Sequence, residues 1–205
     1  MAGSAVTSPS LPVLETFHSI QGEGTQTGFS AFFIRLGGCT VACPWCDTKH
    51  SWPMAGHPRR TLEELAAEAR AHRPAFVLIT GGEPLHHDLT ELCAVLQQAG
   101  LAIHLETSGV DPLSGQFDWI TLSPKAHRPP RPELLTACHA LKVVVHSEDD
   151  LAFAVAMAAR VAETTALLLQ PGAGSETGQR LAIAFIKQHP RWRLSLQTHK
   201  WLGLR

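Results

Sequence analysis

The stretch Gly37-Gly38-Cys39-Thr40-Val41-Ala42-Cys43-Pro44-Trp45-Cys46-Asp47-Thr48 carries three cysteines at the spacing C-x3-C-x2-C. It directly follows an apolar run, residues 31–36, that is typical of a buried strand. Three thiolates on one short loop can bind a single metal centre. Because a closed zinc site and a ferredoxin-type cluster each need four ligands, three cysteines predict an iron–sulfur cluster with one iron open to an outside ligand. A zinc site completed by a histidine is the alternative interpretation.

Apolar strands and amphipathic helices alternate around this loop. We predict strands at residues 31–36, 76–80, 101–107, 119–122, 140–145, 166–170 and 192–197. Helices are predicted at residues 61–71, where Thr61 and Glu64 have capping-box spacing, from Leu89 to just before Gly100, and at 147–160 and 176–189. Between the third and fifth strands only a short helical turn at 133–137 is expected, because three prolines interrupt residues 128–132. This order predicts an α/β fold of six or seven parallel strands with helices missing from its middle.

Polar and glycine-rich groups stand where these strands end. They are the cysteine loop, Gly81-Gly82-Glu83-Pro84, Glu106-Thr107-Ser108-Gly109, Ser123-Pro124-Lys125, Gln170-Pro171-Gly172 and Gln197-Thr198-His199-Lys200. Ligands bind at the C-terminal strand ends of parallel sheets. We therefore expect these groups to meet at one mouth.

Composition excludes several classes of function. The chain of 205 residues is long enough for one substantial domain, expected at residues 13–205, after a Ser-, Ala- and Pro-rich segment, residues 1–12, that we expect to be disordered. A net charge of −1 without a run of Lys or Arg gives no indication of nucleic-acid binding. The apolar runs are too short to cross a membrane, and residues 1–12 lack the order of a signal peptide. The isolated Cys93 and Cys138 indicate a reducing compartment, so a cytoplasmic location is expected.

The cysteine loop, with Trp45 before its third cysteine, and Gly81-Gly82-Glu83-Pro84 after the second strand resemble the radical S-adenosylmethionine (SAM) superfamily. Within it, Ser19-Ile20-Gln21-Gly22-Glu23-Gly24, Arg35, Ser123-Pro124-Lys125 and His199-Lys200 resemble the 7-carboxy-7-deazaguanine synthase family, over nearly the whole chain from Thr16. The resemblance implies a partial, helix-trimmed (βα)6-type radical SAM barrel with parallel strands. It also implies a homodimer.

The resemblance further implies a radical SAM carbon–nitrogen lyase of the 7-deazapurine (queuosine) pathway. Such an enzyme converts 6-carboxy-5,6,7,8-tetrahydropterin to 7-carboxy-7-deazaguanine with loss of ammonia, and a 5′-deoxyadenosyl radical abstracts hydrogen at C6 before SAM is regenerated. The implied cofactors are a [4Fe-4S] cluster, SAM and Mg²⁺, with an electron donor such as flavodoxin. No catalytic residue beyond the cofactor ligands is expected, since cofactors carry such chemistry.

The same resemblance implies a role for each matching residue. The cluster ligands would be Cys39, Cys43 and Cys46. The contacts to SAM would be made by Trp45, Cys46, Asp47, Gly82, Glu83, Ser123, Pro124, Lys125 and Gln170. The pterin would meet Ile20, Gln21, Gly22, Arg35, Thr80, Gln197 and the chain end at Arg205, and Mg²⁺ would bind Thr48.

The residues themselves leave some of these roles open. Arg35 lies inside an apolar strand and therefore demands an anionic partner, which is either the substrate carboxylate or an internal Asp or Glu. Lys125 could equally be a solvated surface lysine. A single threonine, Thr48, is a weak Mg²⁺ ligand that needs waters and substrate oxygens beside it. The twelve histidines contain no i, i+4 pair, and we expect them to be exposed or hydrogen-bonded rather than to form a second metal site.

Two other functions are alternatives. A small radical SAM activase that makes a glycyl radical on a partner protein would share the cysteine loop and Gly81-Gly82-Glu83-Pro84, but it would not need Arg35, Gln21 or Thr48. A non-catalytic iron–sulfur or zinc protein would need a fourth ligand that the sequence does not evidently provide.

Overall fold

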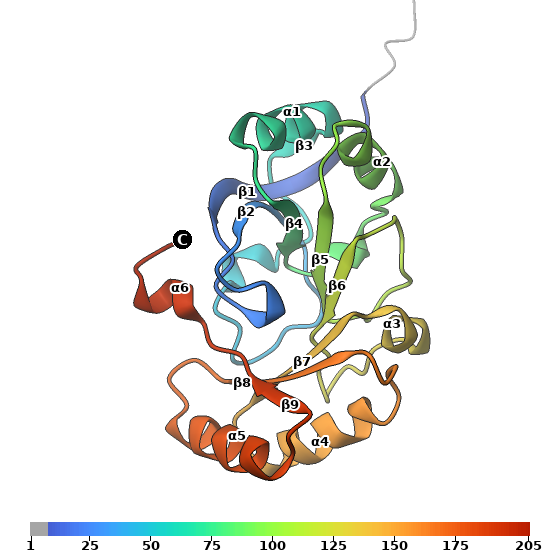
Figure 1. Cartoon of the computed structure of the whole chain (residues 1–205). Coiled ribbons are helices and arrows are strands. Elements are labelled where there is room, and N and C mark those ends of the chain that lie inside the picture. Colours follow the sequence, from blue (N-terminus) through green and yellow to red (C-terminus); the bar gives the residue numbers. More distant parts are fainter. Residues whose placement is uncertain (1–7) are drawn as a thin grey trace, which may run out of the picture.

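A computed structural model describes residues 8–205. The strands in this part of the chain form one nine-stranded sheet (Figure 1). The strand order is β3-β1-β2-β4-β5-β6-β7-β8-β9. Its strands are β1 (Ser10–Ile20), β2 (Ser30–Leu36), β3 (Arg59–Thr61), β4 (Phe76–Gly81), β5 (Ile103–Thr107), β6 (Trp119–Leu122), β7 (Ala140–Val145), β8 (Ala166–Pro171) and β9 (Trp192–Leu194). From β2 to β9 every neighbouring pair is parallel, whereas β1 pairs antiparallel with β2 and β3. The α/β fold and all seven predicted parallel strands are confirmed.

Helices cover the sheet unevenly. The main helices are α1 (Leu62–His72), α2 (Thr90–Gln98), α4 (Glu148–Ala158) and α5 (Glu176–Gln188). In Figure 1, α1 and α2 lie beside the β1–β5 half of the sheet, and α4 and α5 lie beside β7 to β9. No helix joins β5 to β6, and only the short α3 (Pro132–Ala137) joins β6 to β7, as the prolines predicted. Three 3-10 turns, η1 (Gly24–Gln26), η2 (Lys49–Ser51) and η3 (Pro84–His86), and the short α6 (Thr198–Trp201) complete the described chain.

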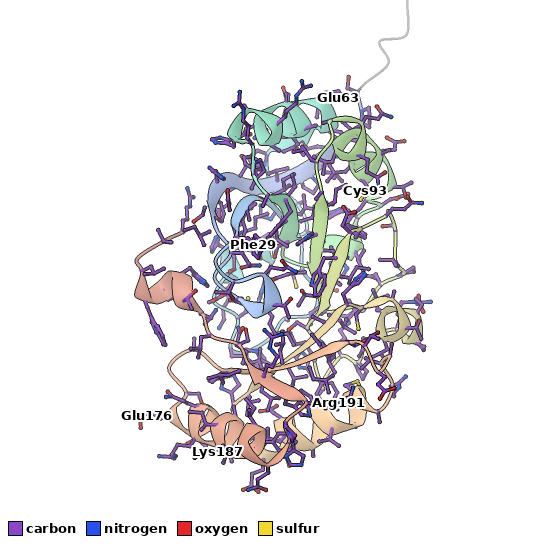
Figure 2. The ribbon with its side chains drawn as sticks, in the orientation of Figure 1. Phe29, Glu63, Cys93, Glu176, Lys187 and Arg191 are labelled. Carbon is purple, nitrogen blue, oxygen red and sulfur yellow. The ribbon has the colours of Figure 1, made fainter. Side chains whose placement is uncertain are left out.

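The core lies between the sheet and its helices. Fully buried residues such as Ile34, Ile79 and Leu105 face leucines of α1 and α2 in one continuous cluster. Charged side chains such as Glu63 of α1 and Lys187 of α5 point to solvent (Figure 2). Helix α1 begins as predicted, because the Thr61 side chain accepts a hydrogen bond from the Glu64 amide in a capping box. A second, smaller cluster of buried residues, formed by Ala31, Phe33, Phe76 and Leu78, is separate from this core.

Three details differ from the sequence predictions. Strand β1 begins at Ser10 and pairs with β3, so the expected disorder of residues 1–12 is wrong at 10–12, while residues 1–7 lie outside the described part. The last strand ends at Leu194 rather than at 197, because the chain turns after Ser195 to begin α6. Neither β3 nor α6 was predicted, since each spans fewer than five residues and has no clear periodicity. In the described residues, no helix is long and apolar enough to span a membrane.

Candidate active site

The cysteine loop leaves the C-terminal end of β2 and forms one wall of a cavity of about 250 Å³. Cys39, Cys43 and Cys46 are free thiols, and all three line this cavity. Burial raises the pKa of the Cys43 thiol, Lys125 opposes that rise, and the neighbouring Cys39 and Cys46 add to it. Within residues 8–205, no group of three His, Cys, Asp or Glu is placed to hold a single metal ion. Three free thiols around one cavity fit a cluster with one open iron, in which each thiolate would bind a different iron.

The glycine-rich turn after β4 packs directly against this loop. The Gly82 amide donates to the Leu36 carbonyl at 2.9 Å, and the Glu83 amide donates to the Gly38 carbonyl at 2.9 Å. A Cβ atom on Gly82 would lie 2.2 Å from the Gly38 carbonyl oxygen, and one on Gly81 would lie 2.2 Å from that of Leu36. These two positions therefore require glycine, because a side chain on Gly82 would push away the cysteine loop and one on Gly81 would push away the end of β2.

The Glu83 carboxylate is buried and fully hydrogen-bonded inside the protein. One oxygen accepts from the Leu85 amide at 3.1 Å and from the Thr107 hydroxyl, and the other accepts from the Ser108 amide at 2.8 Å and from the Ser108 hydroxyl. Four donors use the acceptor capacity of a carboxylate. Glu83 thus ties the glycine-rich turn to the end of β5, and its predicted contact with the amino group of SAM stays a prediction.

Histidines hold the backbone of the cysteine loop. The Thr40 amide donates to His86 Nε2 at 3.0 Å, so this nitrogen is the unprotonated one and His86 Nδ1 donates to Asp111. His87 Nε2 donates to the Gly37 carbonyl at 2.8 Å. The expectation of hydrogen-bonded histidines is confirmed for this pair.

The loop after β6 reaches across to the same backbone. His127 Nε2 donates to the Val41 carbonyl at 3.0 Å, and Arg128 Nη1 donates to the Thr40 carbonyl at 2.6 Å. This loop begins at Ser123-Pro124-Lys125, where the Lys125 ammonium donates to the Ser123 hydroxyl at 2.8 Å. Lys125 lines the first cavity and is half-buried, so the reading of a solvated surface lysine is wrong.

Every residue that the sequence predicts to contact SAM lines the first cavity, except Pro124. A second cavity of about 120 Å³ adjoins it. All the predicted substrate contacts line the second cavity except Gln197, which lines the first. Both cavities share the residues Glu23, Arg35, Asp47, Thr48, Thr80 and Glu106. The two spaces are therefore halves of one site.

A buried charge network forms the floor between the cavities. The Lys142 ammonium on β7 lies 2.5 Å from the Glu23 carboxylate and 3.6 Å from that of Glu106. Burial alone would raise the pKa of Glu23, but the charge and hydrogen bond of Lys142 lower it to about 2. Burial likewise acts to lower the pKa of Lys142, and Glu106 and Glu23 outweigh it and raise that pKa. Glu23 and Lys142 are therefore both charged at neutral pH.

Three glutamines extend this network. Gln21 donates to Glu106 at 3.1 Å, Gln170 donates to Glu23 at 3.0 Å, and Gln197 donates to Glu23 at 2.8 Å. The Gln170 oxygen also accepts from the Ser195 hydroxyl at 2.7 Å. The side chains of Gln170 and Gln197 are thus used to hold Glu23, and their predicted ligand contacts stay predictions.

Arg35 has an internal carboxylate partner, Glu15. Its Nε donates to Glu15 at 2.8 Å, and the second Glu15 oxygen accepts from Arg205. Arg35 nevertheless lines both cavities, with 22% of its side chain exposed. The ion pair therefore does not remove Arg35 from the site.

The predicted magnesium residue lies at the junction of the two cavities. The Thr48 hydroxyl donates to Asp47 at 3.1 Å, and the Lys200 ammonium of α6 donates to Asp47 at 2.8 Å. Burial acts to raise the pKa of Asp47, but the hydrogen bond and charge of Lys200 lower it to about 2. Thr48 therefore stands beside an ionised carboxylate, which is the ligand type that Mg²⁺ prefers.

The chain is similar to known proteins in both sequence and structure. The radical SAM superfamily matches residues 33–139. The 7-carboxy-7-deazaguanine synthase of Prochlorococcus marinus is 51% identical over 95% of this chain and 98% of its own length, and that of Synechocystis sp. is 52% identical over 96% and 94%. The chain belongs to the 7-carboxy-7-deazaguanine synthase family. A crystal structure of QueE from Escherichia coli superimposes with a TM-score of 0.82 at 31% identity, covering 92% of this chain and 94% of that one.

Membership of the 7-carboxy-7-deazaguanine synthase family confirms the predicted enzyme class and the partial radical SAM barrel. It also implies the [4Fe-4S] cluster and SAM, which the three free cysteines and the first cavity fit. The sequence reasoning assigned no role to Glu15, Glu23, Glu106 or Lys142. Lys142 could have been found by the signal that identified Arg35, since both are charges inside apolar strands.

Proposed function

We propose that this enzyme converts 6-carboxy-5,6,7,8-tetrahydropterin to 7-carboxy-7-deazaguanine, with loss of ammonia and without net consumption of SAM. The observation that carries the proposal is the pair of adjoining cavities. One is lined by the three cysteines and the glycine-rich turn, and the other is lined by Arg35 and by carboxylates. A cofactor held in the first would face a substrate held in the second, at the shared wall formed by Thr80 and Glu106.

In the first cavity, Cys39, Cys43 and Cys46 would hold the cluster. A reduced cluster held there would supply the one-electron chemistry by which bound SAM starts hydrogen abstraction at C6 of the substrate. The protein's own part is to orient SAM and exclude water. Gly82 carries no side chain, so its backbone can line the cavity close to the cysteine loop. Lys125, held by Ser123, offers the SAM carboxylate a cation.

In the second cavity, charge and hydrogen bonding match the two ends of a carboxypterin. Arg35 offers guanidinium N–H groups to the substrate carboxylate. The pterin edge opposite carries the 2-amino group and N3–H, both donors, and Glu106 supplies a carboxylate acceptor held by Gln21 and Lys142. Carboxylates line this side of the second cavity. The site therefore suits a neutral ring that presents hydrogen-bond donors rather than an anionic ring. Backbone groups of Ile20 and Gly22 line the remaining wall.

We further propose that Mg²⁺ binds at Thr48 together with Asp47, waters and substrate oxygens, since both side chains line both cavities. On the family resemblance, the enzyme works as a cytoplasmic homodimer and takes its electron from a small carrier such as a flavodoxin.

An anaerobic assay tests the reaction. The reconstituted protein is incubated with SAM, dithionite, Mg²⁺ and 6-carboxytetrahydropterin, and the products are measured by mass spectrometry. A product lighter than the pterin by one ammonia supports the proposal. SAM cleavage that leaves the pterin unchanged and requires a partner protein would instead favour a glycyl-radical activase.

A further inference from the structure

Glu15 joins two arginines at the edge of the second cavity. Its Oε1 accepts from Arg35 Nε at 2.8 Å, and its Oε2 accepts from the side chain of Arg205, the last residue. Both guanidinium groups also lie over the Phe17 ring, at 5.8 Å for Arg35 and 5.3 Å for Arg205. Phe17 itself stacks on Phe33 with 4.6 Å between ring centroids. This cluster holds the C-terminus beside β1 and β2 (Figure 1).

The register of the sheet places Glu15 behind Arg35 as seen from the site. Glu15 stands opposite Arg35 across β1 and β2, and Arg35 stands opposite Thr80 across β2 and β4. Arg35 and Thr80 line both cavities, whereas Glu15 lines neither. Glu15 therefore contacts the guanidinium from the side away from the reacting groups.

The mode of pairing leaves the binding edge of Arg35 available. Only Nε of the Arg35 side chain is used, and within residues 8–205 this side chain makes no other hydrogen bond. A guanidinium has five N–H donors, so four remain on Nη1 and Nη2, which is the edge that can grip a carboxylate with two parallel bonds. If Glu15 were only a counter-ion, both of its oxygens could pair with Arg35. Instead Arg205 takes the second oxygen.

We propose that Glu15 is a positioning residue for substrate binding. It turns Arg35 so that its Nη edge faces the substrate carboxylate, and it holds the Arg205 side chain at the edge of the second cavity. This inference rests on the proposed function, because it takes the substrate to be a pterin with a carboxylate.

Equilibrium binding to the holoenzyme without reductant tests the proposal, because no turnover occurs. Titration calorimetry with SAM and Mg²⁺ present compares 6-carboxytetrahydropterin with tetrahydropterin, which lacks the carboxylate. We expect Glu15→Gln to weaken binding of the carboxylated pterin about tenfold, the loss of one well-placed charge-assisted contact, and to leave that of tetrahydropterin unchanged. Glu15→Asp keeps the charge but has a shorter reach, and its effect should be smaller.

Glu68→Gln is the matched control. Glu68 forms an ion pair of the same kind with Arg60, at 2.6 Å, and lines neither cavity. It should change neither affinity. A second readout is digestion by carboxypeptidase, which should remove C-terminal residues faster from Glu15→Gln than from Glu68→Gln.

The outcomes separate the two proposals. If Glu15→Gln weakens both pterins equally, leaves both unchanged or tightens the carboxylated one, the positioning role is overturned. If the wild-type protein itself binds the carboxylated pterin no better than tetrahydropterin, the substrate assignment fails first, and the inference about Glu15 falls with it.

Discussion

The Lys142 ammonium lies 2.5 Å from the Glu23 carboxylate, and only 5% of the lysine side chain is exposed. The pair joins β7 to the turn after β1, two segments separated by more than half of the chain. Removing one partner of a buried ion pair leaves the other charge without compensation, which is costly. Both the stability of the site and its charge therefore depend on this contact.

The first prediction concerns the loss of this lysine. Lys142→Met should lower the free energy of unfolding by about 3–5 kcal/mol, because the partly buried Glu23 and Glu106 are left without their cation. Urea unfolding at pH 7 measures the change. Lys187→Met, an exposed lysine on α5, is the control and should change stability by less than about 0.5 kcal/mol. Equal effects of the two substitutions would contradict the account.

The second prediction concerns pH. The pKa of Glu23 is about 2 in the folded protein against an ordinary value of 4.5, so its ionisation stabilises the fold above pH 4.5 and this contribution disappears as pH falls from 4.5 towards 2. In Lys142→Met burial acts without the opposing cation, so the pKa of Glu23 should lie above 4.5. The variant should then gain stability relative to wild type as the pH is lowered from 7 to 5. Urea midpoints across this range check the sign, and a constant difference would argue against it.

The third prediction concerns the glycine-rich turn. Gly82→Ala should displace the cysteine loop, because the new methyl group would lie 2.2 Å from the Gly38 carbonyl oxygen. We expect the reconstituted variant to retain much less iron than wild type, measured as iron per chain. Gly100→Ala is the control, since Gly100 has a φ of +74° but no atom within 4 Å of an added Cβ, so only backbone strain is introduced. Full iron content in Gly82→Ala would refute the packing argument.

The fourth prediction concerns His86. His86→Ala removes the acceptor of the Thr40 amide beside Cys39, so the loop should be less rigid and the cluster should be lost faster to a chelator. The decay of cluster absorbance in EDTA measures this rate. His189→Ala, an exposed histidine that contacts the Phe185 carbonyl, should decay like wild type. If both variants decay alike, His86 has no part in holding the loop.

Most of the fold could be predicted from the sequence because its signals are local. Apolar runs marked the seven parallel strands, and the prolines at 129, 130 and 132 marked the gap in the helices. The contacts that build the site are not local. Nothing near Arg35 indicates that Glu15 takes its Nε, and nothing near Glu23 indicates that Lys142 lies beside it, because strand pairing and register decide both. Residues 10–12 look disordered by composition, yet they pair with β3.

The central claim is that SAM in the first cavity and the pterin in the second react directly with each other. The most direct measurement uses 6-carboxytetrahydropterin labelled with deuterium at C6, incubated anaerobically with the reconstituted enzyme, SAM and reductant. We predict a product lighter by ammonia, SAM that is not consumed in proportion, and deuterium appearing in the recovered SAM. Product formed while the recovered SAM stays free of deuterium would contradict direct hydrogen transfer between the two cavities.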